Sequence, residues 1–264
     1  MRDERVGLIP KIITIGVLLF LMAPLAVIVL ASFSPTVLVV FPPKGFSLEW
    51  YANIFTSSAN FVSGFSNSIK IAVIATGIDI LLGVSAALAV TRYNFKGKEL
   101  LITFFTSPMY VPSIAFSFVL LRITSSFLMV PAFTRILLGH IVIILPYIVR
   151  NTLAVLTGFN WTLEDAAASL GASPRQTFLK VTLPLIKPGV LAGSLLSFLY
   201  SFDEAVLGNM LSSPSFITLP IRIMNYMEFS FDPTLAAIST LLIIISLVCI
   251  VLMEKFVGLD MFLK

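Results

Sequence analysis

Long apolar segments dominate the sequence and set the main constraint on its fold. Six segments carry few charges, and they cover residues 12–33, 68–91, 100–121, 135–156, 185–207 and 235–256. Each has about the 20 residues that an α-helix needs to cross ~30 Å of hydrocarbon. Because 58% of the 264 residues are hydrophobic and 11% are charged, a soluble domain would expose a largely apolar surface. The sequence predicts an all-α polytopic membrane protein, with one transmembrane domain over residues 1–264.

Lysine and arginine residues are divided unevenly between the two sides of the predicted membrane. Six spans place both termini on one side, and the loops of that side hold twelve of the 17 basic residues. Those twelve are Arg2, Arg5, Lys11, Arg92, Lys96, Lys98, Arg150, Arg175, Lys180, Lys187, Lys255 and Lys264. The positive-inside rule therefore predicts that both termini are cytoplasmic. A secretory signal is the competing interpretation of residues 12–33, but its apolar core would be only about 7–15 residues long.

The stretch from residue 160 to 188 is the longest polar interruption between apolar segments. We predict two short helices joined at a glycine. Thr162 is expected to cap the first helix, with Asp165 in the capping-box position. Gly171 is expected to end that helix in the left-handed conformation.

The second helix of this stretch is predicted to begin at a second capping box. Ser173 is the expected cap, Pro174 the first helical residue, and Gln176 the side chain that reaches back. Leu183 and Pro184 are expected to close it. Two helices this short cannot bury a core of their own, so we expect the pair to dock on another surface.

Several short motifs in and around this stretch resemble a known family. They are Asp165-Ala166-Ala167, Gly171-Ala172-Ser173, Leu183-Pro184 and Pro188-Gly189. Together they resemble the cytoplasmic EAA loop of bacterial ABC-importer permease subunits, with the family's usual glutamate replaced by Asp165 and Glu164 one place earlier. The resemblance implies a type I importer permease fold and a helix pair that couples to an ATPase. The coupling residues that it implies are Glu164, Asp165, Ala166, Ala167, Gly171, Ala172, Ser173, Phe178 and Pro184.

The same resemblance implies the partners of the chain. These are a second permease subunit expected to be a different chain, two ATPase subunits that bind ATP and Mg, an extracytoplasmic binding protein, and the lipid of the bacterial inner membrane. Residues 201–204 and 214–220 resemble the second permease subunit of spermidine/putrescine importers. The chain has no G-x-x-x-x-G-K-[ST] phosphate loop, so ATP hydrolysis is expected in a separate subunit. No cofactor, catalytic residue, metal site or nucleic acid is expected.

Acidic side chains inside the spans are the candidates for contact with cargo. A carboxylate at a helix centre costs about 2.5–3.5 kcal/mol on insertion scales, so it usually faces a cavity or a partner. Asp79, Asp203 and Glu204 are such residues, and they favour a small cation such as a polyamine. Tyr110 and Tyr200 are further candidates for the pathway.

Each of these candidates has an alternative interpretation. Asp79 suits an interhelical hydrogen bond, Asp203 and Glu204 suit a solvated helix end, and the tyrosines suit packing. His140, the only histidine, is expected to be packed or paired with a polar group. The same importer class carrying iron, phosphonate, an opine or another amine remains open, as do an ATP-independent secondary transporter and an intramembrane enzyme.

Overall fold

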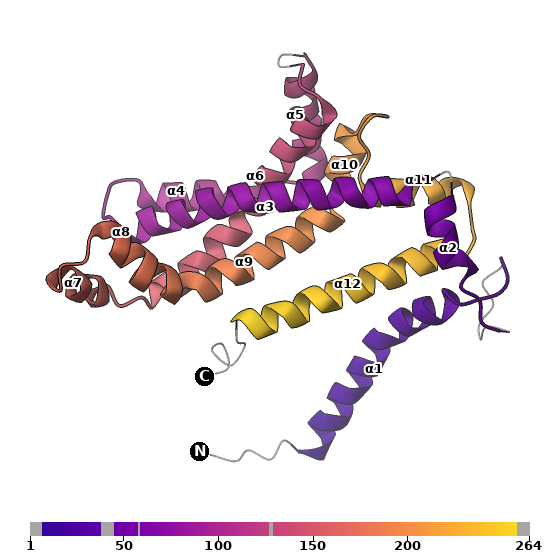
Figure 1. The fold of residues 1–264 in the computed structure, drawn as a ribbon, viewed down its shortest axis with the longest axis horizontal. Coiled ribbons are helices and arrows are strands. Elements are labelled where there is room, and N and C mark those ends of the chain that lie inside the picture. Colours follow the sequence, from indigo (N-terminus) through magenta and orange to yellow (C-terminus); the bar gives the residue numbers. More distant parts are fainter. Residues whose placement is uncertain (1–6, 38–44, 58, 127–128, 258–264) are drawn as a thin grey trace. The chain divides into compact units, whose positions relative to one another are not determined.

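The computed structural model describes residues 7–37, 45–57, 59–126 and 129–257, and regular structure in these ranges is helical (Figure 1). Arg2, Arg5 and Lys264, three of the basic residues on the predicted cytoplasmic side, lie outside the described residues. The α-helices are α1 (Leu8–Ala31), α2 (Glu49–Thr56), α3 (Phe61–Arg92), α4 (Lys98–Thr106), α5 (Ser113–Ser126), α6 (Ala132–Thr157), α7 (Thr162–Ser169), α8 (Pro174–Thr177), α9 (Leu183–Asp203), α10 (Val206–Leu211), α11 (Leu219–Phe229) and α12 (Thr234–Val257). A 3₁₀ turn, η1 (Ser107–Tyr110), follows α4, and a π turn, η2 (Phe178–Thr182), follows α8.

The chain divides into two compact units. The first comprises Met1–Val62 and Ile223–Ser246, and the second comprises Ser63–Arg222 and Leu247–Lys264. Among the described residues, five helices are long and apolar enough to cross a membrane, namely α1, α3, α6, the helix that ends with α9, and α12. The predicted apolar segments therefore form the expected helices, except for the third.

The first unit is held together by polar contacts between α2 and its neighbours. The Trp50 indole is buried and donates its Nε1 hydrogen to the Ser34 carbonyl at 2.6 Å. Tyr226 donates to Asp232 at 2.5 Å, and Asn53 donates to Thr234 at 2.8 Å. Burial raises the pKa of Tyr226, and its hydrogen bond to the Asp232 carboxylate adds to the effect.

Three long helices form the centre of the second unit. Glycines allow them to approach closely: a Cβ at Gly83 of α3 would lie 2.8 Å from Ile148 of α6, and one at Gly189 of α9 would lie 2.6 Å from the Asn151 carbonyl of α6. Small residues are typical of such contacts between membrane helices. Two apolar clusters line α3, one around Ala75 and Ile144 and the other around Ala87, Ile148 and Ile186.

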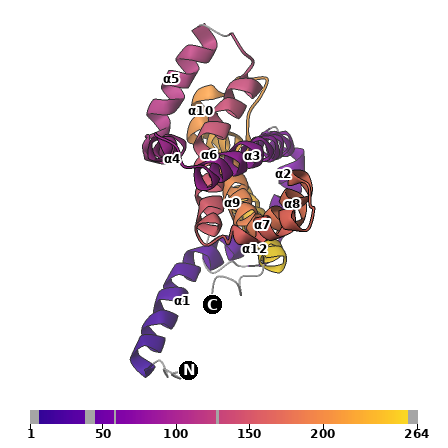
Figure 2. The ribbon, with the colours of Figure 1, turned by 90° about the vertical axis from the view of Figure 1, so that its left-hand side faces the viewer.

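The third apolar segment is broken rather than kinked. The helix Lys98–Tyr110 and the helix Ser113–Ser126 meet at a bend of 102°, which Figure 2 shows between α4 and α5. Pro108 and Pro112 each remove a backbone donor and crowd the carbonyl four residues earlier, so the helix cannot continue through them. The single kinked span predicted over residues 100–121 is therefore two helices, and the pair counts as one span only if both parts are taken together.

The fifth apolar segment begins much earlier than predicted. α8, η2 and α9 form one helical stretch over Pro174–Asp203, so Leu183 and Pro184 do not close a separate short helix. Because Pro184 cannot donate to the Lys180 carbonyl, the wider π turn over Phe178–Thr182 gives the proline ring room without ending the helix. At its other end the helix stops at Asp203, four residues before the predicted end at 207.

Candidate functional site

The polar stretch after α6 contains one short helix, α7, and the start of the long helical stretch Pro174–Asp203, and α7 is capped differently from the prediction. α7 begins at Thr162, and Trp161 occupies the N-cap position without a side-chain cap. Asn160 supplies the missing acceptor: its Oδ1 accepts from the Thr162 backbone N–H at 3.1 Å and from the Thr162 hydroxyl at 2.7 Å. The prediction of Thr162 as the capping residue is wrong, because its hydroxyl donates to the amide two residues earlier.

Gly171 ends α7 in the predicted conformation. Its φ of 84° lies in the left-handed region, which costs an L residue free energy but costs glycine little. The Ala172 N–H donates to the Ala167 carbonyl at 3.0 Å and the Gly171 N–H to the Ala168 carbonyl at 2.9 Å. This pair of bonds is a Schellman motif, which satisfies the last carbonyls of the helix and reverses the chain toward α8.

The capping box at the start of α8 is confirmed. The Ser173 N–H donates to Gln176 Oε1 at 2.8 Å, and the Gln176 N–H donates to Ser173 Oγ at 3.4 Å. Pro174 holds the first helical position, where no backbone donor is needed. Both ends of the turn between α7 and α8 are therefore fixed by local hydrogen bonds.

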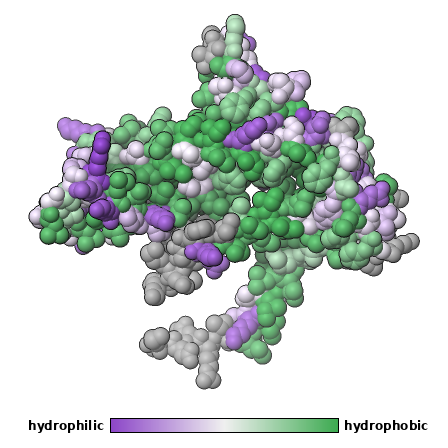
Figure 3. Space-filling view, in the orientation of Figure 1, coloured by the Kyte–Doolittle hydropathy of each residue, from purple (hydrophilic) through white to green (hydrophobic). Residues whose placement is uncertain are grey.

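The outer surface of this helix pair is exposed and carries apolar side chains. Leu170 is 89% exposed, and Leu163 and Leu179 are also exposed. Figure 3 shows hydrophilic and hydrophobic side chains mixed at the end of the second unit that carries α7 and α8. Most of the predicted coupling residues lie on this exposed surface, namely Asp165, Ala166, Gly171, Ser173, Phe178 and Pro184. Ala167 and Ala172 are half-buried.

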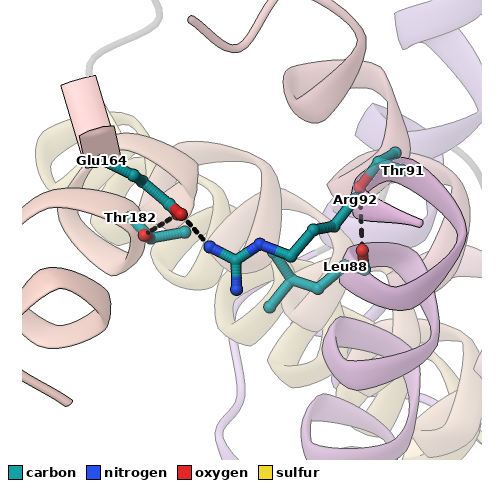
Figure 4. A network of polar contacts seen from close by, with 5 residues as sticks. All are labelled: Leu88, Thr91, Arg92, Glu164 and Thr182. Carbon is teal, nitrogen blue, oxygen red and sulfur yellow. Dashed lines mark hydrogen bonds and ion pairs between the residues drawn. The ribbon is translucent and has the colours of Figure 1, made fainter. Parts of the chain in front are cut away.

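Glu164 differs from the other predicted coupling residues, because its carboxylate faces the interior of the chain. One oxygen pairs with the Arg92 guanidinium at the end of α3, and the other accepts from the Thr182 hydroxyl of η2 (Figure 4). The Glu164 side chain is only 11% exposed. The Arg92 guanidinium also lies 5.4 Å from the Trp161 ring centroid, in the range of a cation–π contact. Glu164 thus joins three separate segments.

Sequence analysis missed three members of this network. Arg92 was predicted only as one of the basic residues of the cytoplasmic side, and no role was predicted for Trp161. One signal in the sequence could have indicated the ion pair. Arg92 ends one apolar segment, and Glu164 begins a polar loop on the same predicted side of the membrane. Spacing alone does not show that the two meet, because 72 residues separate Arg92 from Glu164.

Asp79 lies in the middle of α3 and is fully buried, with 0% of its surface exposed. Among the residues that the structure describes, neither carboxylate oxygen has a hydrogen-bond partner. Along α3 it sits between the two apolar clusters, four residues after Ala75 and four before Gly83. The interhelical hydrogen bond considered for Asp79 is therefore not formed within the described part of this chain.

The other pathway candidates divide into a cluster and two isolated residues. Glu204 is buried, and its Oε1 accepts from the N–H groups of Val206 at 2.8 Å and Leu207 at 3.1 Å, which caps α10. The Tyr200 hydroxyl interacts with Glu204, and the Tyr200 ring packs on Tyr147 with centroids 5.2 Å apart. Tyr147 was not predicted.

The two remaining pathway candidates are exposed. Asp203 ends α9 with an exposed side chain, and Tyr110 of η1 is exposed as well. His140 is buried and its Nδ1 lies 2.7 Å from Ser201 Oγ, which confirms its prediction as a polar-paired residue. A helix-end carboxylate, two tyrosines and a buried carboxylate are thus available to meet a ligand, but they do not form one compact site.

Comparison with solved structures relates the fold to ABC transporters. A bacterial ABC transporter involved in the import of the acidic polysaccharide alginate matches with a TM-score of 0.71 and 18% identity, over 97% of this chain and 98% of that chain. The MetNI methionine ABC transporter matches with a TM-score of 0.61 and 16% identity, over 75% and 94% of the two chains. At these identities the likeness shows the fold alone.

Comparison of sequences gives nearer relatives. The spermidine/putrescine transport system permease protein PotC of Haemophilus influenzae is 32% identical over 80% of this chain and 82% of its own length. The putrescine transport system permease protein PotI of Escherichia coli is 29% identical over 85% and 82%. The trehalose transport system permease protein SugB of Mycobacterium tuberculosis is 32% identical over 79% and 77%.

A family model covers most of the chain. The model of the binding-protein-dependent transport system inner membrane component matches residues 79–259, which include Asp79, the α7–α8 pair and α9. Together with the apolar helices, this match makes the chain an inner-membrane protein. The chain belongs to the family of inner membrane components of binding-protein-dependent transport systems.

Proposed function

We propose that this chain is the permease subunit of an ATP-driven importer and forms part of the path for a polyamine such as putrescine or spermidine. The observation that carries the importer assignment is the α7–α8 pair, which exposes Leu170 and Leu163 while its backbone is fixed by caps. Such a rigid, exposed and partly apolar surface suits docking to a soluble protein. The names of the PotC and PotI relatives support the polyamine cargo.

The proposed complex contains this chain, a second and different permease subunit, two ATPase subunits and an extracytoplasmic binding protein. The ATPase subunits hold ATP and Mg, and hydrolysis takes place there. Residues 1–264 act as a single transmembrane domain, with both termini and the α7–α8 pair in the cytoplasm. The excess of lysine and arginine on that side supports this orientation.

Coupling follows from the continuity of the helix that contains α8 and α9. Closure of the ATPase pair displaces the exposed surface formed by Asp165, Ala166, Gly171 and their neighbours. Because α8 continues through η2 into α9, the displacement reaches the membrane without crossing a loop. Phe178 and Pro184 lie on this continuous stretch and transmit the movement.

The acidic side chains favour a cation along the path. An ammonium group of a polyamine suits the buried Asp79 carboxylate, which lacks a partner within the described chain. Glu204, Tyr200 and the exposed Asp203 and Tyr110 provide further carboxylates and aromatic faces for a cation. The contribution of each residue to transport is part of the proposal.

Another cargo in the same importer class is the second candidate. The trehalose permease relative is as similar in identity as the PotC relative, 32% in both cases, so overall identity does not select the cargo. A sugar carries no charge, so a buried carboxylate can accept hydrogen bonds from its hydroxyls but cannot form an ion pair with it. The test of cargo is therefore also a test of Asp79.

Co-purification and reconstitution test the proposal. The tagged chain is purified in mild detergent, and its partners are identified by mass spectrometry. The complex is then placed in liposomes with its binding protein, and uptake of labelled putrescine and trehalose is measured with and without ATP. We expect an ATPase and a second permease chain to co-purify, and ATP-dependent uptake of putrescine. A chain that purifies alone and transports without ATP would contradict the importer assignment, and uptake of trehalose alone would contradict the cargo.

A further inference from the structure

The attachment of α7 to the rest of the chain depends on few contacts. None of the eight residues of α7 is buried, so apolar packing does not hold this helix in place. Local hydrogen bonds at both ends of α7 fix where the helix begins and ends, but they do not fix its distance from α3. A side-chain contact must set that distance.

Glu164 provides this contact. Its carboxylate is divided between the Arg92 guanidinium of α3 and the Thr182 hydroxyl of η2, as Figure 4 shows. Thr182 is itself buried, so Glu164 reaches the packed base of the helix that continues into α9. A carboxylate that accepts from a guanidinium and a hydroxyl at once is held more firmly than one in a single exposed ion pair.

Aromatic rings complete the arrangement around Arg92. The guanidinium lies 5.4 Å from the Trp161 ring centroid, and the Trp161 ring packs on Phe159 with centroids 4.6 Å apart. Phe159 and Trp161 in turn pack against the apolar cluster of α3, α6 and α9. We refer to Arg92, Trp161, Glu164 and Thr182 as the Arg92 clamp.

We infer that the Arg92 clamp is an internal strut that makes α3 move with α7, and that Glu164 is a positioning residue within this chain rather than a contact to the ATPase. The inference rests on the proposed importer function. Arg92 is the last residue of α3, and Asp79 lies 13 residues earlier in the same helix. At 1.5 Å per residue the clamp is therefore about 20 Å from the buried carboxylate, along one continuous helix. α7 then acts on two membrane helices, on α9 through the chain and on α3 through the clamp.

Neutral variants of Arg92 and Glu164 distinguish a positioning role of Glu164 within this chain from a direct contact between Glu164 and the ATPase. In the reconstituted complex we compare Arg92→Gln, Glu164→Gln and Glu99→Gln, the last an exposed carboxylate of α4 as control. The readouts are putrescine taken up per ATP hydrolysed and the amount of ATPase that co-purifies. We expect both clamp variants to lower the uptake per ATP about tenfold, the size expected for a lost charge-assisted pair, with the amount of ATPase unchanged.

A different pattern would overturn the inference. If Glu164 contacts the ATPase directly, Glu164→Gln reduces the amount of bound ATPase whereas Arg92→Gln leaves the uptake per ATP at the wild-type value. Failure of the importer assignment is distinguishable from both, because the unmodified chain would then bring down no ATPase.

Charge reversal provides the second measurement. Arg92→Glu and Glu164→Arg each place two like charges together, and the double variant restores an opposite pair. We expect the double variant to recover uptake per ATP to within about threefold of wild type, because coupling between contacting charges is not additive. If the double variant falls further than the worse single variant, the clamp is excluded.

If the reversed charges do not fit beside Trp161 and Thr182, a covalent cross-link between the two positions is used as an alternative experiment. Cys249 is the only cysteine of the chain, so Arg92→Cys and Glu164→Cys can be joined by a bifunctional thiol reagent in a Cys249→Ala background. We expect the link to raise uptake per ATP above the unlinked double-cysteine complex. A link that forms without raising it would contradict the clamp.

Discussion

Two carboxylates at α3 have opposite surroundings. Glu164 of α7 is paired with Arg92 at the end of this helix, whereas Asp79 in its middle has no partner among the described residues. Glu164 meets a guanidinium, a hydroxyl and a neighbouring aromatic ring, whereas Asp79 is more deeply buried and has no hydrogen-bond partner among the described residues. A paired carboxylate contributes to the architecture. A buried carboxylate without a partner costs free energy, and such residues in membrane spans usually face a cavity or a partner. Under the proposed function, Glu164 belongs to the part that transmits movement and Asp79 to the part that meets cargo.

Asp79→Asn gives the largest expected effect. The amide keeps the size of the side chain but removes its charge, so we expect putrescine uptake to fall by about thirtyfold, the equivalent of ~2 kcal/mol for one charge-assisted contact. We expect the melting temperature of the detergent-solubilised complex to change little, since the amide is as buried as the carboxyl group and equally lacks a partner within the described chain. Uptake assays and thermal unfolding check both. A lower melting temperature with normal uptake would show that Asp79 pairs with a partner chain for structural reasons.

Gly171→Val gives the second-largest expected loss of uptake. It changes the turn between α7 and α8, in the same region as Glu164. A β-branched residue at a φ of 84° is strained, and the left-handed conformation costs it about 1–2 kcal/mol. We expect the Schellman turn to open and uptake to fall about tenfold. Gly171→Asn is the matched control, because asparagine tolerates this conformation, and its uptake should stay within about twofold of wild type. Equal losses for the two variants would point to side-chain volume instead of backbone strain.

Glu204→Gln tests whether a carboxylate that caps a helix also meets the cargo. The amide oxygen can still accept from the Val206 and Leu207 N–H groups, so α10 should remain intact while the charge is lost. We expect uptake of putrescine to fall about fivefold, with the melting temperature unchanged. Glu204→Ala removes the cap as well, which should cost about 1 kcal/mol of stability. If Gln behaves as wild type and only Ala is impaired, Glu204 is a cap alone and belongs to the architecture.

Ser173→Ala gives the smallest expected effect. It removes one hydrogen bond of the capping box, which is typically worth about 0.5–1 kcal/mol. Uptake should stay within about twofold of wild type, because Pro174 and the Gln176 side chain still favour the helix start. Hydrogen exchange of the Gln176 and Thr177 amides should become faster. Unchanged exchange would show that contacts elsewhere, and not this cap, hold α8.

Local sequence signals predicted the local structure well. Long apolar segments give helices because the backbone must satisfy its hydrogen bonds internally in a membrane. Gly171 and the Ser173–Gln176 box were predictable because a left-handed residue and a capping side chain act within a few residues. Thr162 was assigned wrongly for the same local reason: Asn160, two residues earlier, competes for its hydroxyl.

Contacts between distant residues were not predictable in this way. The Arg92 clamp joins residues on either side of α4, α5 and α6, and no periodicity relates their positions. Leu183 and Pro184 were taken as a helix end because proline usually stops a helix, whereas a π turn absorbs the proline here. Tyr147 is the one Phe, Tyr or Trp in the apolar segment 135–156, and only the packing of α6 against α9 places it beside Tyr200.

The π turn over Phe178–Thr182 has a consequence for how this helix tolerates change. Such a turn holds about one residue more than an α-helical turn, and one residue corresponds to a rotation of about 100°. The direction in which α8 faces relative to α9 is therefore set by the number of residues in this turn. Deleting one residue there would rotate α8 relative to α9 by about 100° without changing the sequence of either helix. In a homologue that lacks the extra residue, α8 would face a different direction, and the partner would need a docking surface in a different orientation.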